Sequence, residues 1–273
     1  MSNNTSAEKV TTEYLCQMKR DGRKIAAITA YDYSTAKLAD ESSMDIVLVG
    51  DSLGPTVLGY PNTIPVTLDQ SLHHTAAVVR GVARAMVIGD MPFMTYQTGT
   101  EQALKNAARY LQEAGADAVK LEGGESIAPT VQRLVTSGVP VLGHIGILPQ
   151  SLLTEGRYRV QGRGQEEADQ LRRDAKALEE AGAFAVVFEG MPLELSRTIT
   201  AELSIPTIGI GAGWYCDGQI QVVHDLLGLT EESETPRHAK QYADLAVQTR
   251  KAFDKYIDEV KNSRFPDDQH SFK

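Results

Sequence analysis

Short runs of apolar residues recur along the chain, and all but one of them end in glycine or a polar residue. Within a run the apolar residues are mostly consecutive rather than alternating, which is typical of parallel strands covered on both faces. The sequence therefore predicts eight strands, at residues 24–32, 46–52, 85–93, 118–123, 139–146, 183–190, 206–213 and 219–225.

The segments between most of these runs have the composition of helices. They are rich in Ala, Leu, Glu, Gln and Arg, and several end in a glycine, such as Gly115, Gly138 and Gly182, that precedes the next strand. Helices are expected at residues 36–43, 68–83, 101–114, 127–137, 165–181 and 193–203. This alternation predicts an α/β fold of βαβ units, and eight strands favour a (β/α)8 TIM barrel.

The eighth strand leaves the barrel prediction open at one point. Only residues 214–218 separate the last two apolar runs, which is too short for a normal crossover between parallel strands. Either a helix is missing there, or residues 219–225 begin a helix, and an open doubly wound sheet is the alternative fold. Apolar residues recur at helical spacing between about 237 and 262. We predict a single domain over residues 1–273, with a barrel core at about 24–228 and an extra C-terminal helix.

Composition and charge exclude several classes of protein. The 273 residues carry a formal net charge of −9, and an acidic surface disfavours binding to nucleic acid or to anionic lipid. The sequence contains no apolar run long enough to span a bilayer and no hydrophobic signal segment at its start. The two cysteines, Cys16 and Cys216, are far apart, which fits a reducing compartment. We expect a cytoplasmic protein with no membrane and no nucleic-acid partner.

Charged and polar residues gather at the carboxyl ends of the predicted strands, which converge on one face of a TIM barrel and form its active site. They are Asp32, Asp51, Ser52, Asp90, Lys120, Glu122, His144, Glu189, His224 and Asp225. Carboxylates from several strands, next to buried residues, are costly unless they are paired or bind a cation. Oxygen ligands favour Mg²⁺ or a similar ion over Zn²⁺. Lys120 and Glu122 are two residues apart and share one face of their strand, so Val119 and Leu121 should pack against helices.

Simpler interpretations apply to single residues of this group. An aspartate at a strand end is more often a helix N-cap or a loop residue than a catalytic group. His144 ends a strand and is compatible with either a site residue or a packing residue. Cys216 has no evident partner base, so a structural role is favoured over that of a nucleophile. The glycine-rich segment 209–213 does not match a dinucleotide-binding fingerprint. The joint pattern indicates an anionic site that can hold a metal.

A set of short motifs runs in order from about residue 12 to the tail at residues 265–272. The motifs are YDYSTAK (31–37), VGDSL (49–53), DMPF (90–93), VKLEGG (119–124), GHIG (143–146), PQS (149–151), VQG (160–162), IPTIGIGAG (205–213) and DGQ (217–219). Together they resemble the ketopantoate hydroxymethyltransferase family, which belongs to the phosphoenolpyruvate mutase/isocitrate lyase superfamily. So many motifs in register make the resemblance specific.

The resemblance implies a TIM-barrel enzyme that depends on Mg²⁺, with one ion per subunit. Its expected substrates are 3-methyl-2-oxobutanoate (2-oxoisovalerate) and the one-carbon donor 5,10-methylenetetrahydrofolate. The product of hydroxymethyl transfer through a metal-stabilised enolate would be 2-dehydropantoate, for pantothenate and coenzyme A biosynthesis. By motif match, the metal site corresponds to Asp51, Asp90 and Glu122, the oxoacid contacts to Asp51, Ser52, Asp90 and Lys120, and the catalytic base to Glu189. The family also implies a homo-oligomer, namely a decamer.

The chain departs from the family pattern at a few positions. Residues 190–192 are Gly-Met-Pro where the family usually has Cys-Val-Pro, Arg157 stands where glycine is common, and residues 147–148 are Ile-Leu rather than Leu-Thr. None of these changes removes a charged site residue, so they bear on fine specificity more than on the reaction class. The alternative function is another Mg²⁺-dependent oxoacid lyase or mutase of the same superfamily, although the Lys-Lys-Cys-Gly-His loop of its lyases is missing. A metabolite-binding barrel without activity is disfavoured by the intact charged residues.

Overall fold

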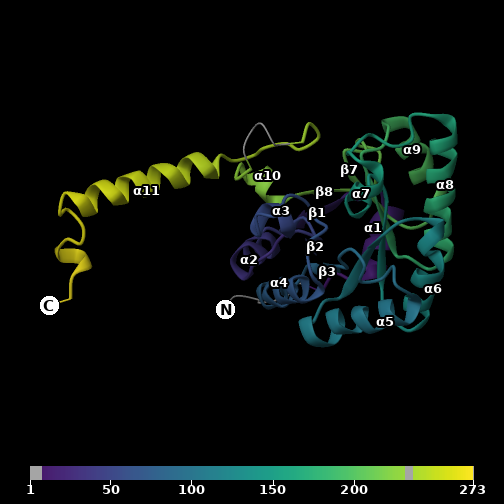
Figure 1. The fold of residues 1–273 in the computed structure, drawn as a ribbon, viewed down its shortest axis with the longest axis horizontal. Helices are drawn as coiled ribbons and strands as arrows, with labels where there is room; N and C mark the ends of the chain where they lie inside the picture. Colours follow the sequence, from purple (N-terminus) through teal and green to yellow (C-terminus); the bar gives the residue numbers. More distant parts are fainter. Residues whose placement is uncertain (1–7, 231–235, 273) are drawn as a thin grey trace. The chain divides into compact units, whose positions relative to one another are not determined.

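The computed structural model describes residues 8–230 and 236–272 and contains a closed barrel of eight parallel strands in chain order (Figure 1). The strands are β1 (Ile25–Thr29), β2 (Ile46–Val49), β3 (Met86–Asp90), β4 (Ala118–Glu122), β5 (Val141–Gly146), β6 (Ala185–Glu189), β7 (Thr207–Ile210) and β8 (Gly218–Gln221). β1 pairs with both β2 and β8, which closes the sheet on itself. The predicted TIM barrel is therefore confirmed, and the open doubly wound sheet is excluded.

Helices enclose the strands, and all six helices expected between them are present (Figure 1). They are α2 (Tyr33–Glu41), α4 (Leu68–Gly81), α5 (Thr100–Arg109), α6 (Ala128–Thr136), α8 (Gln165–Glu180) and α9 (Leu193–Glu202). α5 continues into a π-helical turn, η1 (Tyr110–Ala114), and a 3₁₀ turn, η2 (Glu125–Ile127), precedes α6. Shorter segments follow β2 and β5, namely α3 (Leu53–Val57), η3 (Pro149–Ser151) and α7 (Leu152–Glu155).

The eighth strand is shorter than the apolar run that predicted it. Gly218–Gln221 form β8, and Val223–Leu227 form the helix α10, so both interpretations of this run hold in part. β7 connects to β8 without a helix of its own. A Cβ atom at Gly218 would lie 2.6 Å from the carbonyl oxygen of Ile25, so glycine is what lets β8 approach β1 this closely.

The side chains of the strands alternate between two buried layers. Val119 and Leu121 of β4 belong to the outer cluster that the surrounding helices cover, as predicted. The inward-facing residues, such as Ile46 and Ala118, form a second cluster inside the barrel. The alternation places Lys120 and Glu122, which are even-numbered like Ala118, on the barrel interior.

The helix α1 (Thr12–Arg20) was not predicted from the sequence. Thr11 is the N-cap of this helix, and its side chain accepts a hydrogen bond from the N–H of Tyr14. Only Leu15 and Met18 of this helix are buried, and both join the inner barrel cluster. α1 therefore packs against the inward-facing residues of the strands, a tertiary contact that the mostly polar sequence of the helix does not reveal.

The described residues fall into two compact units, which divide after Val222. The second unit contains α10, α11 (Leu245–Lys261) and a 3₁₀ turn, η4 (Asp268–His270). The C-terminal helix was expected to begin near residue 237 but begins at Leu245, because the N–H of Tyr242 bonds to the carbonyl of Leu226 rather than within a helix. The prediction that residues 1–273 form one domain stays a prediction. None of the helices within 8–230 and 236–272 has the length and apolar content needed to cross a bilayer.

Candidate active site

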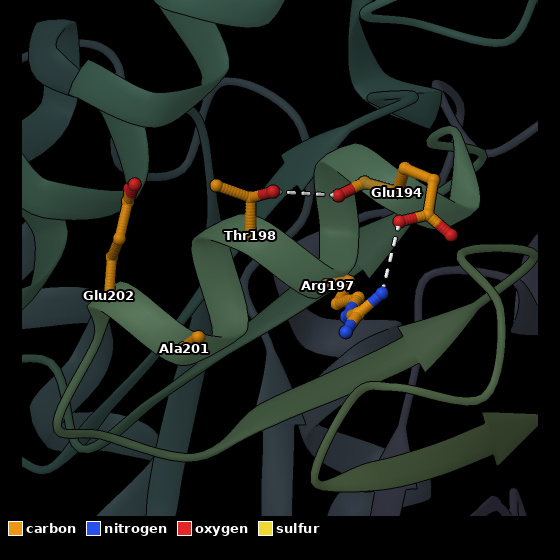
Figure 2. Close-up of a pocket in the computed structure, with 5 residues that line it drawn as sticks. All are labelled: Glu194, Arg197, Thr198, Ala201 and Glu202. Carbon is orange, nitrogen blue, oxygen red and sulfur yellow. Dashed lines mark hydrogen bonds and ion pairs between the residues drawn. The ribbon is translucent and has the colours of Figure 1, made fainter.

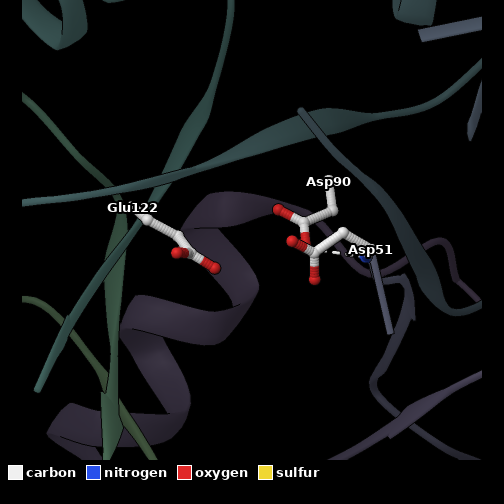
Figure 3. Close-up of side chains that lie close together, drawn as sticks. All are labelled: Asp51, Asp90 and Glu122. Atoms are coloured by element: carbon white, nitrogen blue, oxygen red, sulfur yellow. Dashed lines mark hydrogen bonds between the residues drawn. The ribbon is translucent and has the colours of Figure 1, made fainter. Parts of the chain in front are cut away.

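Three carboxylates converge at the carboxyl ends of neighbouring strands. Asp51 follows β2, Asp90 ends β3 and Glu122 ends β4. One oxygen of each side chain lies within 4.8 Å of the others, and Figure 3 shows the three side chains turned toward one another. All three residues are buried, with exposed fractions of 4%, 1% and 5%. The structure thus brings together the three residues assigned to the metal site, in a spacing and with oxygen ligands that suit one divalent cation.

Strand register explains why these side chains meet. In the barrel, Asp90 is the neighbour of Lys120 across the β3–β4 pair, and Glu122 is the neighbour of His144 across the β4–β5 pair. The main-chain N–H of Asp51 donates to Asp90 Oδ2 at 3.0 Å, which ties the end of β2 to the end of β3. The charged groups therefore form one continuous arc on the inner wall of the barrel.

Lys120 is the cation at the centre of this arc. Its Nζ lies 2.7 Å from Asp90 Oδ1 and 3.4 Å from Glu122 Oε1, and the residue is 4% exposed. Burial alone would lower the pKa of Lys120, but the charges of Asp90, Glu122 and Asp51 outweigh burial and raise that pKa above its ordinary value. Lys120 is therefore positively charged at any pH at which the protein works.

The three carboxyl groups differ in how well the protein compensates their charge. Burial raises the pKa of Asp51 well above its ordinary value, and the charges of Asp90 and Glu122 raise it further. Burial also raises the pKa of Asp90, which Lys120 offsets only in part. For Glu122, burial is outweighed by Lys120 and His144, so its pKa lies below the ordinary value. Asp51 is thus the carboxylate whose charge most needs a further cation.

His144 joins the triad to Glu189. Its Nδ1 lies 3.4 Å from Glu122 Oε1 and its Nε2 lies 3.3 Å from Glu189 Oε2, both as ion-pair contacts without hydrogen-bond geometry. Burial and the charge of Lys120 lower the pKa of His144, but the two carboxylates outweigh them and raise it to about 9. His144 is therefore an imidazolium at neutral pH and lines the site, which resolves the two interpretations left by the sequence.

Glu189 lies at the end of β6, and its side chain is 20% exposed. It is outside the triad, yet His144 is buried between it and the ligand carboxylate Glu122. The side chain of Glu189 is more exposed than those of the triad, so its carboxylate is accessible to a bound molecule. This position fits a group that exchanges protons better than one that holds an ion.

Ser52 directly follows Asp51 and is the residue before the first turn of α3. Its hydroxyl is 2.8 Å from that of the buried Tyr31, and the two share a hydrogen bond. A Cβ atom at Gly50 would lie 2.7 Å from Ser52 Oγ, so glycine is needed before the Asp-Ser pair for the hydroxyl to occupy this place. Of the assigned oxoacid contacts, Asp51, Asp90 and Lys120 are joined by hydrogen bonds, and Ser52 directly follows Asp51 in the chain.

Two buried polar residues of the site were given no role by the sequence reasoning. Gln150 lies in η3 after β5 and Tyr96 lies in the loop after β3, and their exposed fractions are 4% and 2%. Both make hydrogen bonds to the carboxylate arc. Gln150 belongs to the PQS motif, but nothing in a single sequence distinguishes it from a polar loop residue.

Three other residues considered from the sequence, Asp32, Asp225 and Cys216, have structural roles. Asp32 is the N-cap of α2 and accepts a hydrogen bond from the N–H of Thr35 at 2.9 Å, the simpler of its two interpretations. Asp225 belongs to the second unit and accepts from Thr230 Oγ1 at 2.7 Å within that unit. Cys216 is a buried free thiol whose pKa burial raises, which suits packing and not nucleophilic attack.

A separate pocket of about 410 Å³ runs along the outer face of α9 (Figure 2). It is lined by Glu194, Arg197, Thr198, Ala201 and Glu202. Arg197 and Thr198 bond back to Glu194 within the helix, so these polar groups already have partners. None of these residues was assigned to the active site.

Comparison with known proteins identifies the family of the chain. Residues 9–268 match the sequence model of the family described as ketopantoate hydroxymethyltransferase. A 3-methyl-2-oxobutanoate hydroxymethyltransferase from Syntrophus aciditrophicus is 53% identical over 272 residues, covering 100% of both chains. The enzyme of the same name from Chloroflexus aurantiacus is 55% identical over 263 residues, which cover 96% of this chain and 92% of the relative.

Solved structures share the fold at low sequence identity. Phosphonopyruvate hydrolase in complex with oxalate and Mg²⁺ superposes with a TM-score of 0.60 at 13% identity, covering 95% of this chain and 92% of that one. A 2,3-dimethylmalate lyase, a member of the PEP mutase/isocitrate lyase superfamily, gives a TM-score of 0.58 at 15% identity, with 95% and 91% coverage. At these identities the likeness concerns the barrel alone. The full-length family match and the relatives above half identity show that this chain belongs to the ketopantoate hydroxymethyltransferase family.

Proposed function

We propose that this enzyme transfers a hydroxymethyl group from 5,10-methylenetetrahydrofolate to 3-methyl-2-oxobutanoate, forming 2-dehydropantoate for pantothenate and coenzyme A biosynthesis. The observation that carries the proposal is the buried triad of Asp51, Asp90 and Glu122 beside Lys120, with Glu189 outside it. That arrangement supplies what enolate chemistry requires, namely a site for a cation, a group for the substrate carboxylate and a separate base.

The triad fits a divalent cation on chemical grounds. Asp51, Asp90, Glu122 and the adjoining Glu189 bring a formal charge of −4, and Lys120 and the imidazolium of His144 bring +2, which leaves −2. All the ligand atoms of the triad are oxygens, which Mg²⁺ prefers. We propose one Mg²⁺ per subunit at this position, held by these three carboxylates directly or through water. When bound, the ion supplies a Lewis acid for the carbonyl oxygen of the oxoacid.

The oxoacid would lie against Asp51, Ser52, Asp90 and Lys120. Lys120 remains protonated and buried, so it can pair with the substrate carboxylate in a medium where such a pair is strong. The hydroxyl of Ser52 has a fixed orientation through its bond to Tyr31 and can serve the same substrate group.

Glu189 would act as the base that removes the proton from C3 of the oxoacid. Its partly exposed carboxylate can reach a substrate, and the imidazolium of His144 fixes its orientation from behind. The electron pair of the broken C3–H bond forms the enolate, and C3 then attacks the methylene carbon carried by the folate. The bond from that carbon to one folate nitrogen breaks, and the nitrogen keeps the electron pair and takes up the proton removed from C3. Water then hydrolyses the remaining carbon–nitrogen bond, which puts its hydroxyl on the methylene carbon and its proton on the second nitrogen, so tetrahydrofolate leaves and the hydroxymethyl group stays on C3.

The assembly and location of the enzyme are further parts of the proposal. α11 exposes apolar side chains at helical spacing, including Phe253, Tyr256 and Val260, and such a stripe requires a partner surface. We propose a homo-oligomer, a decamer as in the family, in the cytoplasm, without nucleic-acid or membrane partners. Sedimentation should give a particle much larger than one chain, and a stable monomer at micromolar concentration would contradict this.

The function is tested with purified protein, both substrates and controlled metal. Protein treated with EDTA should form no 2-dehydropantoate, as measured by mass spectrometry, and addition of Mg²⁺ should restore the product only when both substrates are present. Full turnover by a demonstrably metal-free sample would contradict the metal assignment. Cleavage of oxoacids in place of hydroxymethyl transfer would instead support a lyase or mutase of the superfamily.

A further inference from the structure

Gln150 is a buried residue that contacts two of the three triad carboxylates, one through its side-chain amide and one through its main chain. Its side-chain Nε2 donates to Asp51 Oδ2 at 3.1 Å and to the carbonyl of Met91 at 3.0 Å. Its main-chain N–H donates to Glu122 Oε2 at 3.1 Å. A single residue of η3 therefore connects the ends of β2, β3 and β4.

The opposite side of the amide is held just as firmly. Gln150 Oε1 lies 2.9 Å from the hydroxyl of Tyr96 and 3.1 Å from Gln97 Nε2, which donates to it. The Tyr96 hydroxyl also accepts a hydrogen bond from the N–H of Glu122 at 3.1 Å. If the amide were turned over, its NH₂ would face the NH₂ of Gln97 and its carbonyl would face Asp51 and the Met91 carbonyl. The network therefore permits one orientation of the amide.

The charge of the donor matters as much as its position. Lys120 already neutralises part of the site by pairing with Asp90 and Glu122. A second cation at Gln150 would cancel charge that a divalent ion needs, whereas a neutral amide fixes one oxygen of Asp51 and leaves the carboxylate fully charged. Since Gln150 Oε1 is occupied by Tyr96 and Gln97, the amide does not itself face the site as a ligand.

We propose that Gln150, supported by Tyr96, is a positioning residue that orients Asp51 and Glu122 for the cation. The inference rests on the metal site proposed above and adds a determinant of its affinity. Residues that orient ligands from outside in this way commonly contribute about 10- to 100-fold to metal affinity. The PQS motif then has a function, because its glutamine is the outer support of the triad.

The test is calorimetric titration of the full-length, metal-free protein with Mn²⁺ and with Mg²⁺. Gln150→Met keeps the length of the side chain and the main-chain bond to Glu122 but removes the amide's hydrogen bonds to Asp51 and to the Met91 carbonyl, and we expect about 10- to 100-fold weaker metal binding. Tyr96→Phe leaves Gln150 in place but frees its orientation, and it should weaken binding by a smaller factor. Gln132→Met, on the exposed face of α6, is the matched control and should bind like the wild type.

A second measurement separates positioning from general stability. Each protein is melted with and without saturating Mn²⁺, and the metal-induced rise in melting temperature is compared. A smaller rise in Gln150→Met, and a less reduced one in Tyr96→Phe, at a Mn²⁺ concentration that just saturates the wild type supports the proposal, even where the metal-free melting temperature falls. Wild-type affinity and a wild-type rise in both variants would overturn it. If the wild-type protein itself bound neither ion, the metal site of the proposed function would be wrong, and this inference with it.

Discussion

Replacing Asp51 by asparagine separates the energetic cost of the buried triad from its function. Asp51 is 4% exposed, and its carboxylate faces those of Asp90 and Glu122 within 4.8 Å. Asparagine retains an oxygen that can accept the hydrogen bond from Gln150 Nε2. The substitution therefore removes one charge and changes the packing little. We expect the metal-free protein to become more stable and the protein to lose its response to Mg²⁺.

The magnitude follows from the distances within the site. Two unit charges at 4.8 Å interact with about 3 kcal/mol at an effective dielectric constant of about 20. Asp51 has two such repulsions, from Asp90 and Glu122, and one weaker attraction, from Lys120. The net repulsion is therefore at least about 3 kcal/mol when Asp51 is ionised, and burial of the charge adds to it. Asp51→Asn should raise the free energy of unfolding of the metal-free protein by about that amount.

The pH dependence has a definite sign. Burial, with the charges of Asp90 and Glu122, raises the pKa of Asp51 above its unfolded value of 3.8, so the folded state binds this proton more tightly. The stability that the proton provides is complete below about pH 4 and is lost as the pH rises through the folded pKa. The advantage of Asp51→Asn over the wild type should therefore grow from pH 4 to pH 8.

Urea unfolding in EDTA and in Mg²⁺ measures both effects. The wild type should gain about 2.7 kcal/mol at a Mg²⁺ concentration 100 times its dissociation constant, and Asp51→Asn should gain close to nothing. Glu180→Gln, at the exposed end of α8, is the control and should change the free energy of unfolding by less than about 0.5 kcal/mol. A variant that is less stable than the wild type in EDTA at pH 8, yet still stabilised by Mg²⁺, would refute the reasoning.

Two further predictions concern the scaffold. Burial raises the pKa of Glu179, but hydrogen bonds from Lys176 and Ser204 outweigh it and lower that pKa to about 2. Glu179→Gln should therefore lower the free energy of unfolding by about 2 kcal/mol at pH 7. This loss should fade as the pH falls from 4.5 toward 2, and an undiminished loss at pH 2.5 would show that the lowered pKa of Glu179 is not its cause. A Cβ atom at Gly89 would lie 2.3 Å from Tyr110 Cδ1, so Gly89→Ala should displace that buried ring. We expect the free energy of unfolding to fall by about 2 kcal/mol or more, measured by thermal unfolding, and an unchanged melting temperature would contradict the packing argument.

The barrel and the polar side of its strands could be predicted because both follow from local periodicity. Eight apolar runs separated by helical segments require parallel pairing, and the two-residue repeat of a strand determines that Lys120 and Glu122 share a face. Convergence of Asp51, Asp90 and Glu122 then follows from the adjacency of β2, β3 and β4.

Features that depend on tertiary contacts could not be predicted in this way. α1 has only two buried residues, so its apolar signal is too weak to predict a helix without the barrel surface it covers. The start of α11 was placed eight residues too early because the N–H of Tyr242, which precedes it, bonds to Leu226 of α10 and not within a helix. The contacts of His144 and Gln150 depend on distances between strands and loops far apart in the sequence.

The central claim is that Glu189 forms an enolate from the oxoacid, and Glu189→Gln tests it. Glutamine keeps the shape of the side chain and its contact with His144, but it cannot accept the proton. Exchange of the C3 proton of 3-methyl-2-oxobutanoate with deuterated water requires no folate, so it reports on enolate formation alone. Glu194→Gln, whose parent side chain on α9 is 71% exposed, serves as the matched control.

The measurement is the rate of that exchange by NMR, with Mg²⁺ present, for wild type, Glu189→Gln and Glu194→Gln. The account predicts a fall of about 10²-fold or more for Glu189→Gln, with Mg²⁺ and oxoacid affinities nearly unchanged and with wild-type exchange in Glu194→Gln. Exchange at the wild-type rate in Glu189→Gln would contradict the account and reduce Glu189 to a positioning role.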